Sequence, residues 1–143
     1  MKIYIAGPLF TQAERQWNAK LASALRQRCT AEIALPQDFC RGTTSSKVMF
    51  SRCLSELTTS QAVVLNADGA DVDAGSAFEA GVAHQLGIQL VSYRTDLRRA
   101  GDSEFDVNLM LAHAGAFLNC HGDTVDTVAS KLLKEIRTNY IGY

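Results

Sequence analysis

The fold is decided by one acidic stretch, Asp68-Gly69-Ala70-Asp71-Val72-Asp73-Ala74-Gly75-Ser76-Ala77-Phe78-Glu79. The apolar run at residues 62–65 before it predicts a buried strand. Phe78, Val82 and Leu86 then recur at helical spacing. An acidic segment between a strand and a helix is expected at the carboxyl edge of a parallel sheet, where open α/β folds bind their ligands.

The rest of the chain alternates short apolar runs with helical periods. Strands are predicted at residues 2–6, 31–35, 61–66, 88–93 and 116–119, and helices at 11–28, 46–57, 75–86, 107–114 and 123–140. Residues 37–46 and 94–106 are polar or charged without a period, so both are expected to be surface loops. Strands that alternate with helices pair in parallel through right-handed crossovers. We therefore predict a three-layer α/β sandwich whose five-stranded parallel sheet has the order 2-1-3-4-5.

The composition is that of a globular protein with a small-molecule partner. The 143 residues fit one domain, residues 1–143, with 47% hydrophobic and 20% charged residues. The net charge of −1 gives no reason to expect a nucleic acid or an anionic membrane as partner. No apolar run approaches the ~18 residues of a membrane span, and the N-terminal run is too short for a signal sequence. A cytoplasmic protein is expected.

The sequence shows none of the common metal or cofactor motifs. The four cysteines do not form a Cys-x-x-Cys pair, and their spacing to the histidines fits no familiar zinc site, so free thiols are expected at Cys29, Cys40, Cys53 and Cys120. Glycine-rich dinucleotide and triphosphate motifs are absent. Ser76 does not lie in a nucleophile elbow. No metal and no cofactor are expected.

Two carboxylates in the acidic stretch are candidates for chemistry. Asp73 is placed to cap the following helix, and Glu79 lies within two turns of its positive end, which favours an ionised carboxylate suited to nucleophilic attack. The small residues of this helix suggest close packing around Glu79 against the sheet. The alternative is that Asp73 only caps and Glu79 lies on a solvated face. Asp68 and Asp71 are expected only to solvate the turn.

The predicted strand order places a second segment opposite this stretch. The switch point lies between the first and third strands, so the turn after Ala6 faces the acidic turn. Tyr4, Phe10 and Glu79 are expected to share a pocket there. A tyrosine in a buried strand needs a hydrogen-bond partner, and a pocket carboxylate would supply one. The alternative is that Tyr4 is simply a core aromatic.

Three blocks of sequence resemble the nucleoside 2-deoxyribosyltransferase family. They are Lys2-Ile3-Tyr4-Ile5-Ala6-Gly7-Pro8, Asp73-Ala74-Gly75-Ser76-Ala77-Phe78-Glu79 and Asn108-Leu109-Met110-Leu111. The resemblance implies a flavodoxin-like fold and exchange of the base between a 2′-deoxynucleoside and a free nucleobase. It also implies a homo-oligomer, in which Asn108 enters the site of the neighbouring subunit.

The same resemblance assigns roles to individual residues. Glu79 matches the nucleophile at the anomeric carbon, Tyr4 the phenol that orients it, and Asp73 an aspartate that contacts the sugar hydroxyl or the base. The further residues that the resemblance places at the substrate are Phe10 near the base, Tyr143 closing the pocket, and Gly7 and Ser76 within the matched blocks.

One position departs from the family pattern. Cys53 stands where members often have Asp or Asn, and a thiol is a poor substitute for a carboxylic acid. Either Asp73, Asp38 or a terminal carboxylate protonates the leaving base, or the substrate range differs. Asp38 is a candidate base contact or, equally, a residue of the loop surface.

Two other functions remain open on the sequence. A 2′-deoxynucleoside 5′-monophosphate N-glycosidase would share the fold and the glutamate but needs a phosphate site. Arg94, Arg98 and Arg99 could form one, although the alternative is a solvated charged loop. A non-catalytic nucleotide-binding domain on the same fold is the second rival.

Overall fold

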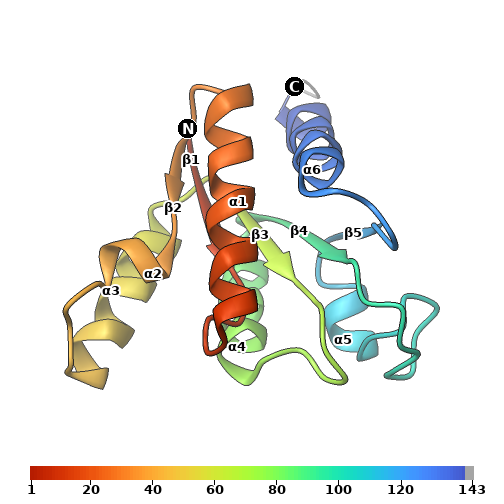
Figure 1. The fold of residues 1–143 in the computed structure, drawn as a ribbon, viewed down its shortest axis with the longest axis horizontal. Coiled ribbons are helices and arrows are strands. Elements are labelled where there is room, and N and C mark those ends of the chain that lie inside the picture. The colour runs from red at the N-terminus through yellow and green to blue at the C-terminus, as the bar shows by residue number, and fades with distance from the viewer. Residues whose placement is uncertain (141–143) are drawn as a thin grey trace.

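The protein is built on a five-stranded parallel sheet, whose strands lie side by side from β2 on the left to β5 on the right behind α1 in Figure 1. The computed structural model describes residues 1–140, and its last described side chain is that of Ile136. The strands are β1 (Lys2–Ala6), β2 (Glu32–Ala34), β3 (Ala62–Asn66), β4 (Gln89–Arg94) and β5 (Ala116–Asn119). Every neighbouring pair is parallel, and the order is β2-β1-β3-β4-β5. The predicted fold class and strand order are confirmed.

Helices cover both faces of this sheet. They are α1 (Gln12–Arg28), α2 (Pro36–Phe39), α3 (Ser46–Thr58), α4 (Ala74–Gln85), α5 (Leu109–Ala112) and α6 (Val125–Tyr140). Side chains of a strand alternate between the two faces. Ile3 and Ile5 of β1 therefore pack with α1 and α6, whereas Tyr4 and Ala6 pack with α3 and α4. Across the described residues, no helix is long and apolar enough to cross a membrane.

The short helix α2, which was not predicted from the sequence, lies next to Tyr4. Residues 37–46 were expected to be a loop, but α2 begins at Pro36, whose fixed φ suits the first turn of a helix. A four-residue helix is too short to show a hydrophobic period. It brings the ring of Phe39 to 6.3 Å from the ring of Tyr4, so Phe39 of α2 packs against the core cluster that contains the tyrosine.

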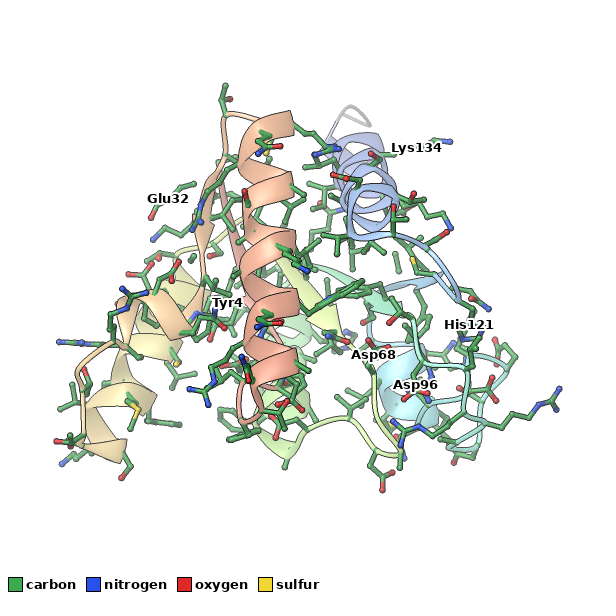
Figure 2. All side chains as sticks on the ribbon, in the orientation of Figure 1. Tyr4, Glu32, Asp68, Asp96, His121 and Lys134 are labelled. Carbon is green, nitrogen blue, oxygen red and sulfur yellow. The ribbon has the colours of Figure 1, made fainter. Side chains whose placement is uncertain are left out.

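The turn after β3 and the loop after β4 are joined by hydrogen bonds. Asp68 accepts from the backbone N–H of Thr95 (2.6 Å) and of Asp96 (2.8 Å), and from the hydroxyl of Thr95 (2.7 Å). Figure 2 shows Asp68 and Asp96 together beyond the carboxyl ends of the strands. The expectation that Asp68 only solvates the turn is therefore wrong. Two loops that leave neighbouring parallel strands carry unpaired N–H groups, and a carboxylate between them satisfies several at once.

The prediction that Arg94 lies in a charged surface loop is also wrong. It is the last residue of β4, only 1% exposed, and its guanidinium donates to the carbonyl oxygens of Ala67 and Arg98. The strand predicted to end at residue 93 is one residue longer. The buried arginine joins the loop after β3 to the loop after β4 by hydrogen bonds. It is not available as part of a surface phosphate site.

We expect Asp68→Ala to lower the free energy of unfolding by about 1–3 kcal/mol, because it leaves three donors at the sheet edge without their acceptor. Urea denaturation measures this difference. The matched control is Asp71→Ala in the same turn, an exposed aspartate whose loss should change stability by less than about 0.5 kcal/mol. Equal effects of the two substitutions would show that Asp68 does not hold the loops.

Candidate active site

Two residues 75 positions apart in the chain form the centre of the site. The hydroxyl of Tyr4, on β1, donates to Oε1 of Glu79, on α4, over 2.6 Å. Tyr4 is fully buried and Glu79 is half-buried. The structure thus gives the buried tyrosine the carboxylate partner that the sequence led us to expect. Among the described residues Oε2 of Glu79 has no hydrogen-bond partner, so one oxygen of the carboxylate is held and the other is open.

The electrostatics of Glu79 differ from the expectation. Burial raises the pKa of Glu79 to about 7, against the opposing hydrogen bond from Tyr4, and the negative charge of Asp73 adds to the rise. The prediction that the helix end favours an ionised Glu79 is therefore wrong in its net sign. Helix-end fields act mainly within the first turn, whereas Glu79 is packed against the sheet, where desolvation is the larger effect.

Tyr4 remains a hydrogen-bond donor throughout the ordinary pH range. Burial raises its pKa, and the neighbouring Glu79 raises it further. Because the phenol keeps its proton, it can donate to the ionised carboxylate of Glu79 and so orient it.

Asp73 caps α4, as predicted. Its Oδ2 accepts from the backbone N–H of Ser76 (2.9 Å) and from the Ser76 hydroxyl (3.0 Å). Ser76 is buried, so its hydroxyl serves the cap. Within the described chain, Oδ1 of Asp73 has no partner. One carboxylate oxygen is therefore structural, and the other is open beside Glu79.

A cavity of about 450 Å³ borders the Tyr4–Glu79 pair through Cys53, although neither Tyr4 nor Glu79 lines it. Cys53, on α3, lines this cavity, and its thiol is close enough to Tyr4 for each group to shift the pKa of the other. Gln37 lines it as well; its amide nitrogen donates to the carbonyl of Arg15 (3.0 Å), while its Oε1 is buried without a partner. Sequence reasoning missed Gln37, although its position directly after Pro36, past the end of β2, marks the ligand edge of the sheet.

Several expected site residues lie apart from this pair. Asp38, beside Gln37, faces Arg26 (3.5 Å) and Arg41 (3.8 Å) and does not line the cavity. Phe10 is 69% exposed and has no aromatic partner among the described residues. Gly7 has a packing role, because a Cβ there would lie 3.1 Å from Cβ of Asn66. Tyr143 lies outside the described residues.

Two of the three arginines considered for a phosphate site are bound to other groups of the chain. Arg94 is buried, and Arg98 grips the carboxylate of Asp96 with two of its nitrogens. This ion pair lowers the pKa of Asp96 below its usual range. Arg99 is exposed. In the described part of the chain, no three His, Cys, Asp or Glu side chains converge as a metal site.

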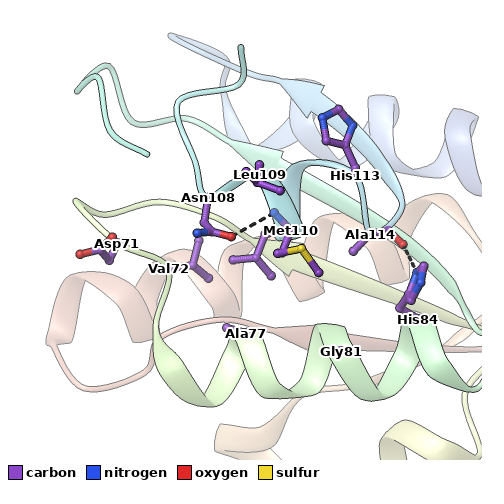
Figure 3. A pocket seen from close by; sticks show the side chains of 11 residues that line it. Asp71, Val72, Ala77, Gly81, His84, Asn108, Leu109, Met110, His113 and Ala114 are labelled. Atoms are coloured by element: carbon purple, nitrogen blue, oxygen red, sulfur yellow. Dashed lines mark hydrogen bonds between the residues drawn. The ribbon is translucent and has the colours of Figure 1, made fainter. Parts of the chain in front are cut away.

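Asn108 opens on a different cavity, of about 560 Å³, between α4 and α5 (Figure 3). It caps α5, with its Oδ1 accepting from the N–H of Met110 (3.0 Å). Ala77 and Gly81 line this cavity from one flank of α4. Glu79 lies about 200° around the helix from both, since each residue turns the helix by about 100°. The structure therefore does not bring Asn108 to the Glu79 of its own chain.

The chain resembles proteins of one family. Residues 3–120 match the family model of nucleoside 2-deoxyribosyltransferase. A conserved protein from Enterococcus faecalis V583 is 29% identical, with a TM-score of 0.76 over 97% of this chain and 98% of that chain. A 2-deoxyribosyltransferase from Bacillus psychrosaccharolyticus is 20% identical (TM-score 0.69, 90% of each chain). The CMP N-glycosidase of Clostridium botulinum is 13% identical (TM-score 0.65, 94% and 99%). No protein with a curated description matches.

The raised pKa of Glu79 predicts a pH-dependent stability. Between its ordinary pKa of 4.5 and about 7, the folded protein keeps a proton that the unfolded chain loses, so the free energy of unfolding falls as pH rises through this window. Glu79→Gln does not titrate. We therefore compare the free energy of unfolding of Glu79→Gln with that of the wild type by urea denaturation. The difference, variant minus wild type, should be about 2 kcal/mol larger at pH 8 than at pH 5.

The control for this measurement is Asp71→Asn, which removes an exposed carboxylate from the same segment. Its effect should be the same at both pH values. An equally constant difference for Glu79→Gln would contradict the raised pKa.

Proposed function

Because the chain belongs to the nucleoside 2-deoxyribosyltransferase family, we propose that it exchanges the base of a 2′-deoxynucleoside by double displacement at Glu79. The observation that carries this proposal is the 2.6 Å hydrogen bond from Tyr4 to Glu79. It places an oriented carboxylate with one open oxygen at the carboxyl edge of the sheet, between β1 and β3, where an α/β fold of this order binds ligands.

The chemistry needs a carboxylate of this kind. Breaking an N-glycosidic bond builds positive charge on the sugar, which an adjacent anion stabilises and then captures. Oε2 of Glu79 would form the bond to the anomeric carbon while Tyr4 holds Oε1. A second base then attacks from the side that the first base left, which returns the original configuration and gives ping-pong kinetics.

The charge state of Glu79 suits this sequence of steps. With a pKa of about 7, a substantial fraction of the carboxyl groups is ionised at neutral pH. A weakly solvated carboxylate also has more to gain from a cationic sugar than one surrounded by water, because the interaction is stronger at low dielectric.

The cavity beside the pair is the proposed base site. Its buried acceptor, Oε1 of Gln37, would accept from an N–H of the base, which would satisfy an otherwise unpaired oxygen. Burial raises the pKa of Cys53 to about 11, so its thiol stays protonated at the position where the family resemblance leads us to expect Asp or Asn. Asp38 is turned toward Arg26 and Arg41. Of the carboxylates considered for protonating the leaving base, Asp73 is the best placed among the described residues.

A second copy of the chain would complete the site. The outward side of α4 exposes Phe78 (52%), its C-cap Leu86 is 55% exposed, and the ring of Phe50, on α3, lies 6.2 Å from that of Phe78. Contiguous exposed apolar side chains of this kind mark interaction surfaces. Asn108 lies beside the flank of α4 that does not carry Glu79. We propose a homo-oligomer through the outward side of α4, in which Asn108 of one subunit reaches the substrate on Glu79 of another.

A 5′-monophosphate N-glycosidase is the second candidate. Arg15 and Arg41 line the cavity beside the catalytic pair, and two cations near the substrate would suit a phosphate group. The glycosidase would use the same glutamate and release the sugar to water instead of a second base. The two functions therefore differ in the acceptor and in the need for a phosphate.

The test incubates a deoxynucleoside with and without a second free base. We expect the deoxynucleoside of the second base as product, and a deoxyribosyl adduct on Glu79 by mass spectrometry. Glu79→Gln should reduce turnover by at least about 10³-fold, because the covalent intermediate cannot form. Hydrolysis that ignores the acceptor, or a strict need for a 5′-phosphate, would support the glycosidase instead. A wild-type rate for Glu79→Gln would end the nucleophile assignment.

The subunit exchange of Asn108 is tested by complementation. Asn108→Asp keeps the acceptor that caps α5 but loses the amide donor, so it should be folded and impaired. When it is co-assembled with Glu79→Gln at equal amounts, mixed dimers carry one intact site if Asn108 acts on the other subunit. We expect recovery of up to about a quarter of the wild-type rate. If the mixture is no faster than the summed rates of the two variants measured separately, both residues act in the site of the same subunit.

A further inference from the structure

Two thiols meet in the cavity that adjoins the catalytic pair. Cys40, the C-cap of α2, and Cys53, on α3, both line it. Besides burial, the hydroxyl of Tyr4 and the thiol of Cys40 both act on the pKa of Cys53, so both groups are neighbours of its thiol. The two thiols therefore face one cavity, next to the residue that donates to Glu79.

Bonds between the preceding residues hold the two cysteines together. The guanidinium of Arg52, next to Cys53, donates to the carbonyl oxygen of Phe39, next to Cys40, over 3.1 Å. The same nitrogen donates to the hydroxyl of Thr43 over 2.7 Å. The end of α2 is thus tied to α3 by the residue that precedes Cys53.

We propose that Cys40 and Cys53 form a reversible disulfide on exposure to a peroxide, and that this bond closes the cavity beside Glu79. In the first step, the sulfur of Cys40 attacks one oxygen of hydrogen peroxide, the O–O bond breaks, and a sulfenic acid and one water form. In the second, the sulfur of Cys53 displaces the sulfenic hydroxyl, which leaves as a second water with the thiol proton. The two thiols lose two electrons and the peroxide gains them.

The surroundings of the two thiols set this order of attack. Burial keeps Cys53 as a neutral thiol, with a pKa raised to about 11, so it is the poorer first nucleophile and the resolving partner. The other two cysteines are placed differently. Cys29 donates its thiol to the carbonyl oxygen of Leu25 (3.3 Å), and Cys120 is buried in the core on the α1–α6 side of the sheet. Neither lines the cavity.

The disulfide would change the site in two ways. It draws the Cys53 sulfur toward Cys40 to a bond length of about 2 Å, which takes it away from Tyr4 and places the bridge in the cavity. It also fixes α2 to α3, next to Phe39, which covers the ring of Tyr4. The effect on activity rests on the proposed function, whereas the formation of the bond does not.

The bond itself is tested by peptide mapping of the full chain after peroxide treatment. Residues 29–41 contain no Lys or Arg before Arg41, so trypsin leaves Cys29 and Cys40 in one peptide. The mapping is therefore done in a Cys29→Ser background, where a link between peptides 29–41 and 53–94 identifies the Cys40–Cys53 bond. We expect this link to form with hydrogen peroxide and to disappear with dithiothreitol. Its absence under conditions that oxidise the thiols would overturn the proposal.

Base exchange is measured on the same samples. We expect oxidation to lower the rate by about 10²-fold and dithiothreitol to restore it, because the bridge displaces groups around the reacting atoms. The base-exchange rate of Cys40→Ser should be the same with and without peroxide treatment. An unchanged rate in the linked protein would overturn the closure of the cavity. If the reduced protein exchanges no base, the proposed function fails, and peptide mapping still decides whether the disulfide forms.

Discussion

The site depends on the hydrogen bond between Tyr4 and Glu79, and that bond depends on the parallel sheet. Tyr4 pairs with Val63 in register, so β1 and β3 lie side by side and α4, which follows β3, passes over β1. Tyr4 points to the α4 face because side chains alternate along the strand. A shift of one residue in this register would turn the phenol toward α1 and leave the carboxylate without a donor.

Burial of Glu79 opposes stability and favours chemistry through the same physical effect. Desolvation penalises the anion, which is why the pKa rises to about 7. The hydrogen bond from Tyr4 offsets part of this penalty without neutralising the charge. In the proposed reaction, a cationic sugar would offset the rest, so the charged carboxylate would be stabilised most when charge develops on the substrate.

The sequence predicts features that depend on periodicity and capping. It does not predict the burial or the pKa of a side chain whose neighbours in space are distant in sequence. Strand order, the Asp73 cap and the Tyr4–Glu79 pair followed from spacing and chain order. Arg94 was read as a surface charge because its neighbours in sequence are charged, although its neighbours in space are loop carbonyls. The raised pKa of Glu79 also depends on burial, which a helix-end argument omits. Asn108 and Tyr143 matched family positions, but the described residues of one chain cannot test their roles.

The sides of α4 have four different environments, and this division explains the layout of the site. Its inner side, with Ala80 and Ala83, packs on the sheet. One flank carries Glu79 toward β1, and the opposite flank lines the cavity of Asn108. The outward side is apolar and exposed at Phe78. A single chain can use only one flank for catalysis, because a helix cannot turn both toward the same substrate. A second copy against the outward side is the arrangement that could bring the two flanks together.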